Sequence, residues 1–180
     1  MKYLFLAFSP MTLAFLAALG AASVAQAQIV AIGDSNIAGK GVASSDNYPA
    51  KLERTLRARG YKGTITNAGI NGDTTQGVLS RLDRDVPPGT KVAIVWIGVN
   101  DIRRHGVSIE SVRANKQEIV NRLRARGIKV ILLGRQYHPT GHPELLQDDR
   151  DQHLNSAGYD LVVSQTLSQV QAALGGGGRK

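Results

Sequence analysis

The stretch QIVAIGDSNIAGKGV, residues 28–42, determines how the rest of the sequence is interpreted. Its apolar run ends at Gly33, and the polar residues Asp34 and Ser35 follow directly. An apolar run that stops at a glycine is typical of a buried strand leading into a turn or a helix. Such a turn can hold a phosphate group or present a nucleophilic side chain, and the spacing of the next residues distinguishes the two.

The spacing does not fit a phosphate-binding loop. A Walker-type loop requires a glycine, four residues, and then Gly-Lys followed by Ser or Thr. Here five residues separate Gly33 from Gly39, and Gly41 follows Lys40 where the hydroxyl residue should stand. A Gly-x-Gly-x-x-Gly dinucleotide pattern is also absent from this turn. We therefore interpret the stretch as a loop that presents Ser35, and Lys40 as an ordinary surface residue.

The rest of the sequence alternates between two kinds of hydrophobic pattern. Apolar, β-branched runs predict strands at 28–33, 63–67, 91–97 and 128–134. Helical patterns lie at 47–59, 74–84, 108–126 and 155–174. This alternation indicates an α/β fold in which a parallel sheet carries helices on both faces.

Two nearly identical segments, LRARGYK at 56–62 and LRARGIK at 123–129, predict two helix ends of the same kind. Each places basic side chains in the last helical turn and a glycine just past it. Basic residues interact favourably with the helix dipole there, and glycine adopts the left-handed conformation that ends a helix. We interpret the pair as the same helix-to-strand connection occurring twice.

The N-terminal 27 residues are typical of a signal peptide. Lys2 precedes a mostly apolar stretch, and Ala25 and Ala27 occupy the small-residue positions of a cleavage site. The remainder is predicted to be one domain at 28–174, followed by a flexible GGGGRK tail at 175–180. We therefore expect a periplasmic or secreted protein, with no stable membrane insertion after cleavage. The alternative is an uncleaved membrane anchor.

The charge of the chain gives weak information about its partners. The formal net charge is +8, and the chain has no cysteine to form disulfides. Much of the basic excess is arginine on predicted helices, as in LERTLRARG and NRLRARG, which indicates solvated helix faces. The sequence lacks the basic stripe interleaved with aromatic residues that would predict nucleic-acid binding.

Ser35 lies just past the carboxyl end of the first predicted strand, where open parallel sheets bind ligands. It could also simply cap the helix that follows. A serine nucleophile needs a base, and the four histidines are His105, His138, His142 and His153. His153 directly precedes the last predicted helix, with Asp148, Asp149 and Asp151 close before it. A carboxylate at this distance can fix the tautomer of the imidazole ring.

Donors for an oxyanion are available after the second and third predicted strands. TNAGINGDTT ends with Gly69 and Gly72, and glycine lets a backbone amide approach a ligand closely. WIGVND offers Asn100, whose side-chain amide is a neutral donor suited to a developing oxyanion. Taken singly, each of these residues is equally typical of an ordinary turn or helix cap.

Four motifs in this order resemble the GDSL family of SGNH hydrolases: Gly-Asp-Ser, the glycine of NGDT, Gly-x-Asn-Asp, and HLNSAGY before the last helix. The resemblance covers about residues 28–174. It implies a flavodoxin-like three-layer α/β/α sandwich with four to five strands, and hydrolysis of esters or thioesters without a metal or organic cofactor. By match, Ser35 is the nucleophile and His153 the general base. The Ser35 amide, the Gly72 amide and the Asn100 side chain form the oxyanion hole, while Asp34 and Asp101 are structural.

The sequence departs from the family pattern in two places. The family has Asp-x-x-His, but the residue three before His153 is Arg150. We favour Asp149 as the orienting acid over Asp151, because on a helical turn the fourth residue back faces the histidine. The segment 135–152 also shows no fifth strand pattern.

These departures keep a second function class open, a non-catalytic module of the same fold that binds the cell envelope. A metal site at His138 and His142 is a third, weaker interpretation. For the enzyme, we expect a small-molecule or envelope ester as substrate, with no nucleic acid. We expect the 35–48 region and the RQYHPTGHPELL loop to line a small pocket that accepts short acyl groups.

Overall fold

The computed structural model describes residues 29–175. The predicted signal peptide at 1–27 and residues 176–180 of the predicted tail lie outside the described residues. Within them, four strands form one parallel sheet in the order β2-β1-β3-β4. The strands are β1 (Ile29–Gly33), β2 (Ile65–Gly69), β3 (Val92–Trp96) and β4 (Lys129–Leu133). The predicted α/β fold is confirmed, with the strand positions correct to within two residues.

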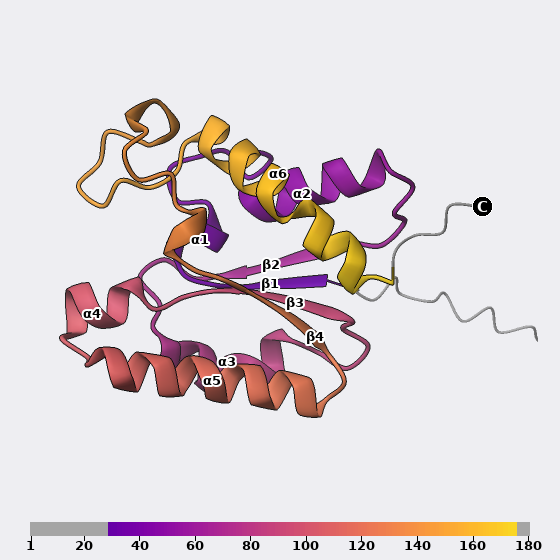
Figure 1. Ribbon diagram of the computed structural model, residues 1–180, viewed down its shortest axis with the longest axis horizontal. Coiled ribbons are helices and arrows are strands. Elements are labelled where there is room, and N and C mark those ends of the chain that lie inside the picture. The colour runs from indigo at the N-terminus through magenta and orange to yellow at the C-terminus, as the bar shows by residue number, and fades with distance from the viewer. Residues whose placement is uncertain (1–28, 176–180) are drawn as a thin grey trace, which may run out of the picture.

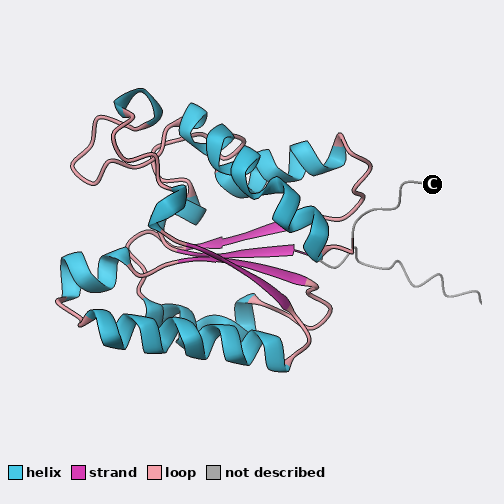
Figure 2. Ribbon diagram, in the orientation of Figure 1, coloured by secondary structure: helices cyan, strands magenta, loops and turns pink. Residues whose placement is uncertain are grey.

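Helices cover both faces of the sheet and complete the three layers (Figure 1). One face carries α2 (Tyr48–Arg57) and α6 (Ser156–Ala173), and the other carries α3 (Thr75–Asp85) and α5 (Ile109–Ala125). Figure 2 shows the four strands between these two helical layers. Along β1 the side chains alternate, so that Ile29 and Ala31 pack with α2 and α6 while Val30 and Ile32 pack with α3 and α5. Because both faces of β1 are buried, its sequence is one continuous apolar run.

The long helices begin where the sequence places them. Asn47, Thr74, Ser108 and Asn155 are the N-caps of α2, α3, α5 and α6, and each side chain accepts a hydrogen bond from a backbone N–H of the first turn. These four residues are the first residues of the predicted helical ranges. The N–H groups in the first turn of a helix have no acceptor within the helix, and a side chain at the N-cap supplies one. Residues with such side chains therefore mark helix starts in the sequence.

The two LRARG segments end their helices in the same way. Gly60 and Gly127 both have positive φ angles, 89° and 74°. The N–H of the next residue donates back to a leucine carbonyl five positions earlier, Tyr61 to Leu56 and Ile128 to Leu123, both at 3.1 Å. This is the hydrogen bond of a Schellman end, and it turns the chain toward the following strand.

Two short helices at the carboxyl end of the sheet were not predicted. They are α1 (Ser35–Ala38) after β1 and α4 (Val99–His105) after β3. The sequence indicates only a loop or a helix cap at both stretches and no helical range, because four and seven residues are too few to show a helical period. They determine where Ser35 and Asn100 lie.

The segment between β4 and α6 forms no fifth strand within residues 29–175. It contains the short 3₁₀ helices η1 (Arg135–Tyr137) and η2 (Pro143–Leu145), and an isolated antiparallel bridge between Leu146 and Leu154. The sheet described therefore has four strands, the lower of the two numbers expected. None of the helices in this range has both the length and the hydropathy that crossing a membrane would require.

Candidate active site

Ser35 is the first residue of α1, directly after the turn that ends β1. Asp34 is the N-cap of this helix, and its Oδ1 accepts from the Asn36 N–H at 3.0 Å. The Ser35 hydroxyl is therefore not the helix cap. Gly33 is required at the turn, because a Cβ there would lie 1.9 Å from the Trp96 carbonyl oxygen. The Gly-Asp-Ser sequence thus combines a close approach between strands, a helix cap and a hydroxyl that is not used for capping.

His153 connects Ser35 to a carboxylate. Its Nε2 lies 3.0 Å from Ser35 Oγ, although the two residues are 118 positions apart in the sequence. On the other side of the ring, Nδ1 contacts Asp149 Oδ2 at hydrogen-bonding distance, and the His153 backbone N–H donates to Asp149 Oδ1 at 2.9 Å. Both Ser35 and His153 are buried. The three side chains therefore form one continuous hydrogen-bonded line.

The charge on Asp149 is stabilised by this contact. Burial raises the pKa of the Asp149 carboxyl, but the side-chain and backbone hydrogen bonds from His153 outweigh it, so that the pKa lies below its ordinary value. An ionised Asp149 accepts the Nδ1 proton of His153, which leaves Nε2 facing Ser35 as an acceptor.

Asp151, the alternative acid, lies elsewhere. Its Oδ2 accepts from Arg104 Nη2 of α4 at 2.6 Å, and it forms no hydrogen bond or ion pair with the His153 ring. Asp149 reaches His153 from a turn and not from the helical turn assumed in the sequence analysis. In that turn the Gln152 N–H donates to the Asp149 carbonyl at 3.1 Å, and Gln152 has a φ of 52°. Gln152 is the single non-glycine residue with positive φ in the described range, so the pairing depends on an unfavourable backbone conformation.

Hydrogen bonds to three successive carbonyls hold the loop that carries His153. His138 Nε2 lies 3.1 Å from the Gln152 oxygen, and the Gln147 N–H donates to the His153 oxygen at 2.7 Å. The Gln147 side chain donates to the Leu154 oxygen at 2.7 Å and to the Lys40 oxygen, also at 2.7 Å. These contacts support the histidine loop where a fifth strand is lacking, and the sequence analysis anticipated neither His138 nor Gln147 in this position.

Three N–H groups in the segments that follow β1, β2 and β3 have unused hydrogen-bonding capacity. In the described part of the chain, neither the Ser35 nor the Gly72 backbone N–H has a hydrogen-bond acceptor. Asn100, buried on α4, donates one Nδ2 proton to the Asp73 carbonyl at 2.9 Å and keeps the other free. Gly72 has a φ of 82°, which favours glycine at this turn. Donors without acceptors are what an oxyanion requires.

Two acids and one arginine hold the strand ends together. Asp101 accepts from the Thr75 N–H at 3.0 Å and contacts the Thr75 hydroxyl, which anchors α3 to α4. Asp73 accepts from Arg81, and Arg81 also donates to the carbonyls of Gly33 and Ala68, at the ends of β1 and β2. The role of Arg81 could not be predicted from sequence, because it depends on partners up to 48 residues away.

A cavity of about 540 Å³ opens beside Ser35, His153 and Asn100. Its walls come mainly from α4, α5 and the segment after β4. Of the loops expected to line the pocket, RQYHPTGHPELL contributes Arg135, His138 and Thr140, but the 35–48 region contributes only its first two residues. The prediction for that region was therefore largely wrong.

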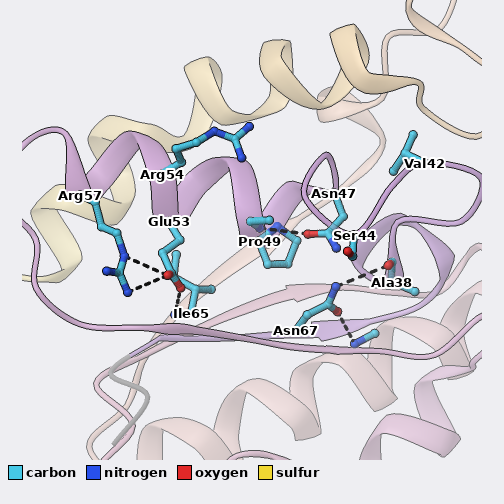
Figure 3. A pocket seen from close by; sticks show the side chains of 12 residues that line it. Ala38, Val42, Ser44, Asn47, Pro49, Glu53, Arg54, Arg57, Ile65 and Asn67 are labelled. Atoms are coloured by element: carbon cyan, nitrogen blue, oxygen red, sulfur yellow. Dashed lines mark hydrogen bonds and ion pairs between the residues drawn. The ribbon is translucent and has the colours of Figure 1, made fainter. Parts of the chain in front are cut away.

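Four residues of the 35–48 region, Ala38, Val42, Ser44 and Asn47, border a second hollow of about 800 Å³ at the free edge of β2 (Figure 3). Glu53 lies there between Arg57 and the Ile65 backbone, and accepts from the Ile65 N–H at 2.7 Å. Asn67 extends toward Ala38 and accepts from the Gly69 N–H. These two side chains thus accept hydrogen bonds from backbone N–H groups at the edge of β2. None of Ser35, His153 and Asp149 lines this hollow, so it is separate from the candidate active site.

The histidines other than His153 are not arranged around a metal. His138 contacts Thr140 and the Gln152 carbonyl, His142 pairs with Glu144, and His105 ends α4. Among residues 29–175, no group of three or more His, Asp or Glu side chains is placed to hold a metal ion.

The sequence pattern of the GDSL-like Lipase/Acylhydrolase family matches residues 31–157. This chain belongs to that family. The match begins in β1, includes Ser35, Asn100 and His153, and ends in the first turn of α6. The resemblance noted from the four motifs is thereby confirmed.

Individual relatives agree with the family assignment. Esterase TesA of Pseudomonas aeruginosa is 33% identical over 122 residues, which cover 66% of this chain and 59% of that protein. An arylesterase of Vibrio mimicus is 28% identical over 116 residues, 64% of this chain and 58% of that protein. The chain thus spans just under three fifths of the length of these two relatives. The crystal structure of AlinE4, an SGNH-hydrolase family esterase, superposes with a TM-score of 0.60 at 31% identity, over 81% of this chain and 95% of that one.

Proposed function

We propose that this protein hydrolyses carboxylic esters through an acyl-enzyme formed on Ser35. The observation that supports this most directly is the line from Ser35 Oγ through the His153 ring to Asp149, with 3.0 Å between Oγ and Nε2. A serine hydroxyl is a weak nucleophile, and an adjacent base oriented by an acid is the arrangement that activates it. The relatives named esterase and arylesterase perform chemistry of this class.

In the first half of the reaction, Ser35 Oγ attacks the ester carbonyl carbon while His153 Nε2 takes its proton. The carbonyl oxygen becomes an oxyanion that accepts from the Ser35 N–H, the Gly72 N–H and Asn100 Nδ2. The bond to the leaving alkoxide then breaks, and His153 returns the proton to that oxygen, so that an alcohol departs. Asp149 stabilises the imidazolium throughout without taking its proton.

In the second half, water attacks the acyl carbon and gives its proton to His153 Nε2. The same three donors stabilise the second oxyanion. The C–O bond to Ser35 breaks, His153 returns the proton to Ser35 Oγ, and the carboxylic acid leaves. Both halves use only groups of this chain and water, so no cofactor or metal takes part in the proposed mechanism.

Two departures motivated the non-catalytic envelope-binding alternative: Arg150 at the position of the family acid, and the segment 135–152 without a fifth strand. Asp149, one residue earlier, supplies a carboxylate to His153. The change at Arg150 is therefore a weaker reason to expect a protein without catalytic activity. Hydrolysis of 4-nitrophenyl acetate and butyrate by the wild type, Ser35→Ala and His153→Ala tests the choice. We expect turnover that both substitutions abolish while the protein stays folded. Equal turnover in all three proteins would refute the proposed enzyme.

We propose further that residues 1–27 are removed after Ala27 and that the protein acts in the periplasm or outside the cell. The support is the sequence alone: Lys2, the apolar stretch and the Ala25-x-Ala27 site. The mass of the protein recovered from the periplasm or culture medium tests this, because cleavage predicts an N-terminus at Gln28. A cytoplasmic protein that retains Met1 would contradict it.

A further inference from the structure

The cavity beside Ser35 has a strongly cationic wall. Four of its lining residues are Arg103 of α4, Arg113 and Lys116 of α5, and Arg135 of η1. Arg113 and Lys116 are three positions apart and so lie on the same face of their helix. Three elements that are distant in sequence therefore bring positive charge to one cavity.

These four cations lack the acidic partners that other basic residues have. Within residues 29–175, none of them forms an ion pair, whereas Arg57, Arg81 and Arg122 each pair with an acid four residues away. The cavity has two acidic lining residues, Asp34 and Asp151. Asp151 is already paired with Arg104, and burial raises the pKa of Asp34 to about 7, which reduces its negative charge near neutral pH. The cavity therefore carries a net positive charge that the protein does not neutralise.

Lys116 is the cation built most closely into the site. The three arginines are exposed, but Lys116 is half-buried. Its side chain occupies the space that a side chain at position 98 would need, and this space is open because residue 98 is glycine. A Cβ on Gly98 would lie 2.7 Å from Lys116 Cε and 2.9 Å from Nζ. The ammonium group thus lies against the backbone two residues before Asn100. Burial lowers the pKa of Lys116, while Asp101 and Asp34 act to raise it from a distance. A partly desolvated ammonium without a direct partner is stabilised by an anionic ligand.

The same cavity also has an apolar wall. Val99, Ile102 and Ile109 are among the five large hydrophobic side chains that are exposed in the described range, and all three line it. Exposed apolar side chains gathered at a cavity are typical of a binding surface. The ligand therefore needs both an apolar part and a negative charge.

We propose that the natural substrate is an ester carrying an anionic group, a carboxylate, sulfate or phosphate, which binds in this cavity beside Lys116. The inference rests on the proposed ester hydrolysis at Ser35 and adds the class of substrate. The anionic group belongs either to the acyl part or to the leaving alcohol, and the same cations would recognise both.

Two pairs of esters test the proposal and separate these sources. Mono(4-nitrophenyl) adipate and 4-nitrophenyl hexanoate have acyl groups of equal carbon number and differ in a terminal carboxylate. 4-Acetoxybenzoate and its methyl ester differ in a carboxylate on the leaving group. The ratio of kcat/KM for the anionic ester to that for its neutral match is the anionic preference. Because both esters use the same catalytic groups, the ratio cancels any general loss of activity in a variant.

The matched variants are Lys116→Met and Lys129→Met, each of which removes one positive charge. Lys129 begins β4, at the amino end of the sheet and away from the cavity. We expect the wild type to prefer one anionic ester by about tenfold, and Lys116→Met to lower that preference by about fivefold or more. Lys129→Met should leave the preference within about twofold of wild type. Arg113 is exposed, so that Arg113→Gln should change the stability of the fold little. It should lower the same preference by a smaller factor.

The pair that responds identifies the part of the substrate that bears the charge. Hydrolysis of the neutral esters with no anionic preference, or with a preference that Lys116→Met and Arg113→Gln leave unchanged, would overturn this inference alone. No turnover of any ester by folded wild type, or equal turnover by Ser35→Ala, would overturn the proposed function and this inference with it.

Discussion

Asp149 binds His153 twice, through the ring Nδ1 and through the backbone N–H at 2.9 Å, from a position four residues earlier in the chain. Arg150 stands at the third position back, where the family pattern has its acid. The histidine therefore keeps an acidic partner although the spacing has changed. The change is accommodated by the turn at Gln152, with its φ of 52°.

Replacing Asp149 tests whether this contact orients the ring. Asp149→Asn should lower kcat by about 10²- to 10⁴-fold, because the amide can donate to Nδ1 and so favour the tautomer that carries its proton on Nε2. KM should change much less. Asp151→Asn should cause only a small loss, because a partly exposed ion pair with Arg104 contributes little. Steady-state kinetics on 4-nitrophenyl butyrate measures both. A large loss in Asp151→Asn with little effect in Asp149→Asn would reverse the assignment.

Gln147 should matter for stability and for activity together. Gln147→Ala removes the two side-chain hydrogen bonds to Lys40 and Leu154 oxygens, and we expect a loss of about 1–3 kcal/mol in the free energy of unfolding. We also expect kcat to fall, since the loop that holds His153 is then less constrained. Gln117→Ala is the matched control, because the Gln117 side chain bonds only to Asn121 on the surface of α5. Urea unfolding and kinetics give the two readouts. Equal stability of the two variants would show that Gln147 does not hold the loop.

Asp34 should make stability depend on pH. Burial raises the pKa of Asp34 from 3.8 to about 7, so between these values the folded protein keeps a proton that the unfolded chain has lost. This contribution to stability is complete below about pH 4 and is lost as the pH rises through about 7. Its size is at most roughly 4 kcal/mol.

Asp34→Asn preserves the helix cap but removes the titration. The free energy of unfolding of the variant, relative to wild type, should therefore increase between pH 4 and pH 8. Urea unfolding of both proteins at the two pH values measures this difference, and the direct comparison cancels the titration of all other groups. A difference that stays constant with pH would show that Asp34 is ionised in the folded protein.

The features that sequence predicted are those determined by nearby residues. The caps Asn47 and Asn155 and the glycines of the LRARG ends act within one helical turn, so local patterns locate them. The strands are readable because β1 and β3 are buried on both faces. Ser35 and Asn100 were proposed because their motifs stand after strands, whose carboxyl ends meet at one edge of the sheet. His153 was proposed because it directly precedes the last predicted helix and has acidic residues close before it.

The features that sequence did not predict depend on distant partners. Lys116 lies near the site because Gly98, in another element, has no side chain, and no pattern within α5 indicates that contact. His138 reaches the Gln152 carbonyl from 14 residues away through irregular chain. The third motif lies on the short helix α4 and lines the cavity, whereas the sequence indicates either a turn or a helix cap there. Such contacts arise only when the loops at the sheet edge are placed relative to one another.

The central claim is that Ser35 is a nucleophile activated by His153, and covalent labelling tests it most directly. Folded wild-type protein is treated with a serine-reactive fluorophosphonate, and intact and peptide masses locate the adduct. We predict one adduct, on the peptide that contains Ser35, with none in Ser35→Ala and much slower labelling in His153→Ala. Folded wild-type protein that remains unlabelled, or that is labelled at a different residue, would contradict the account.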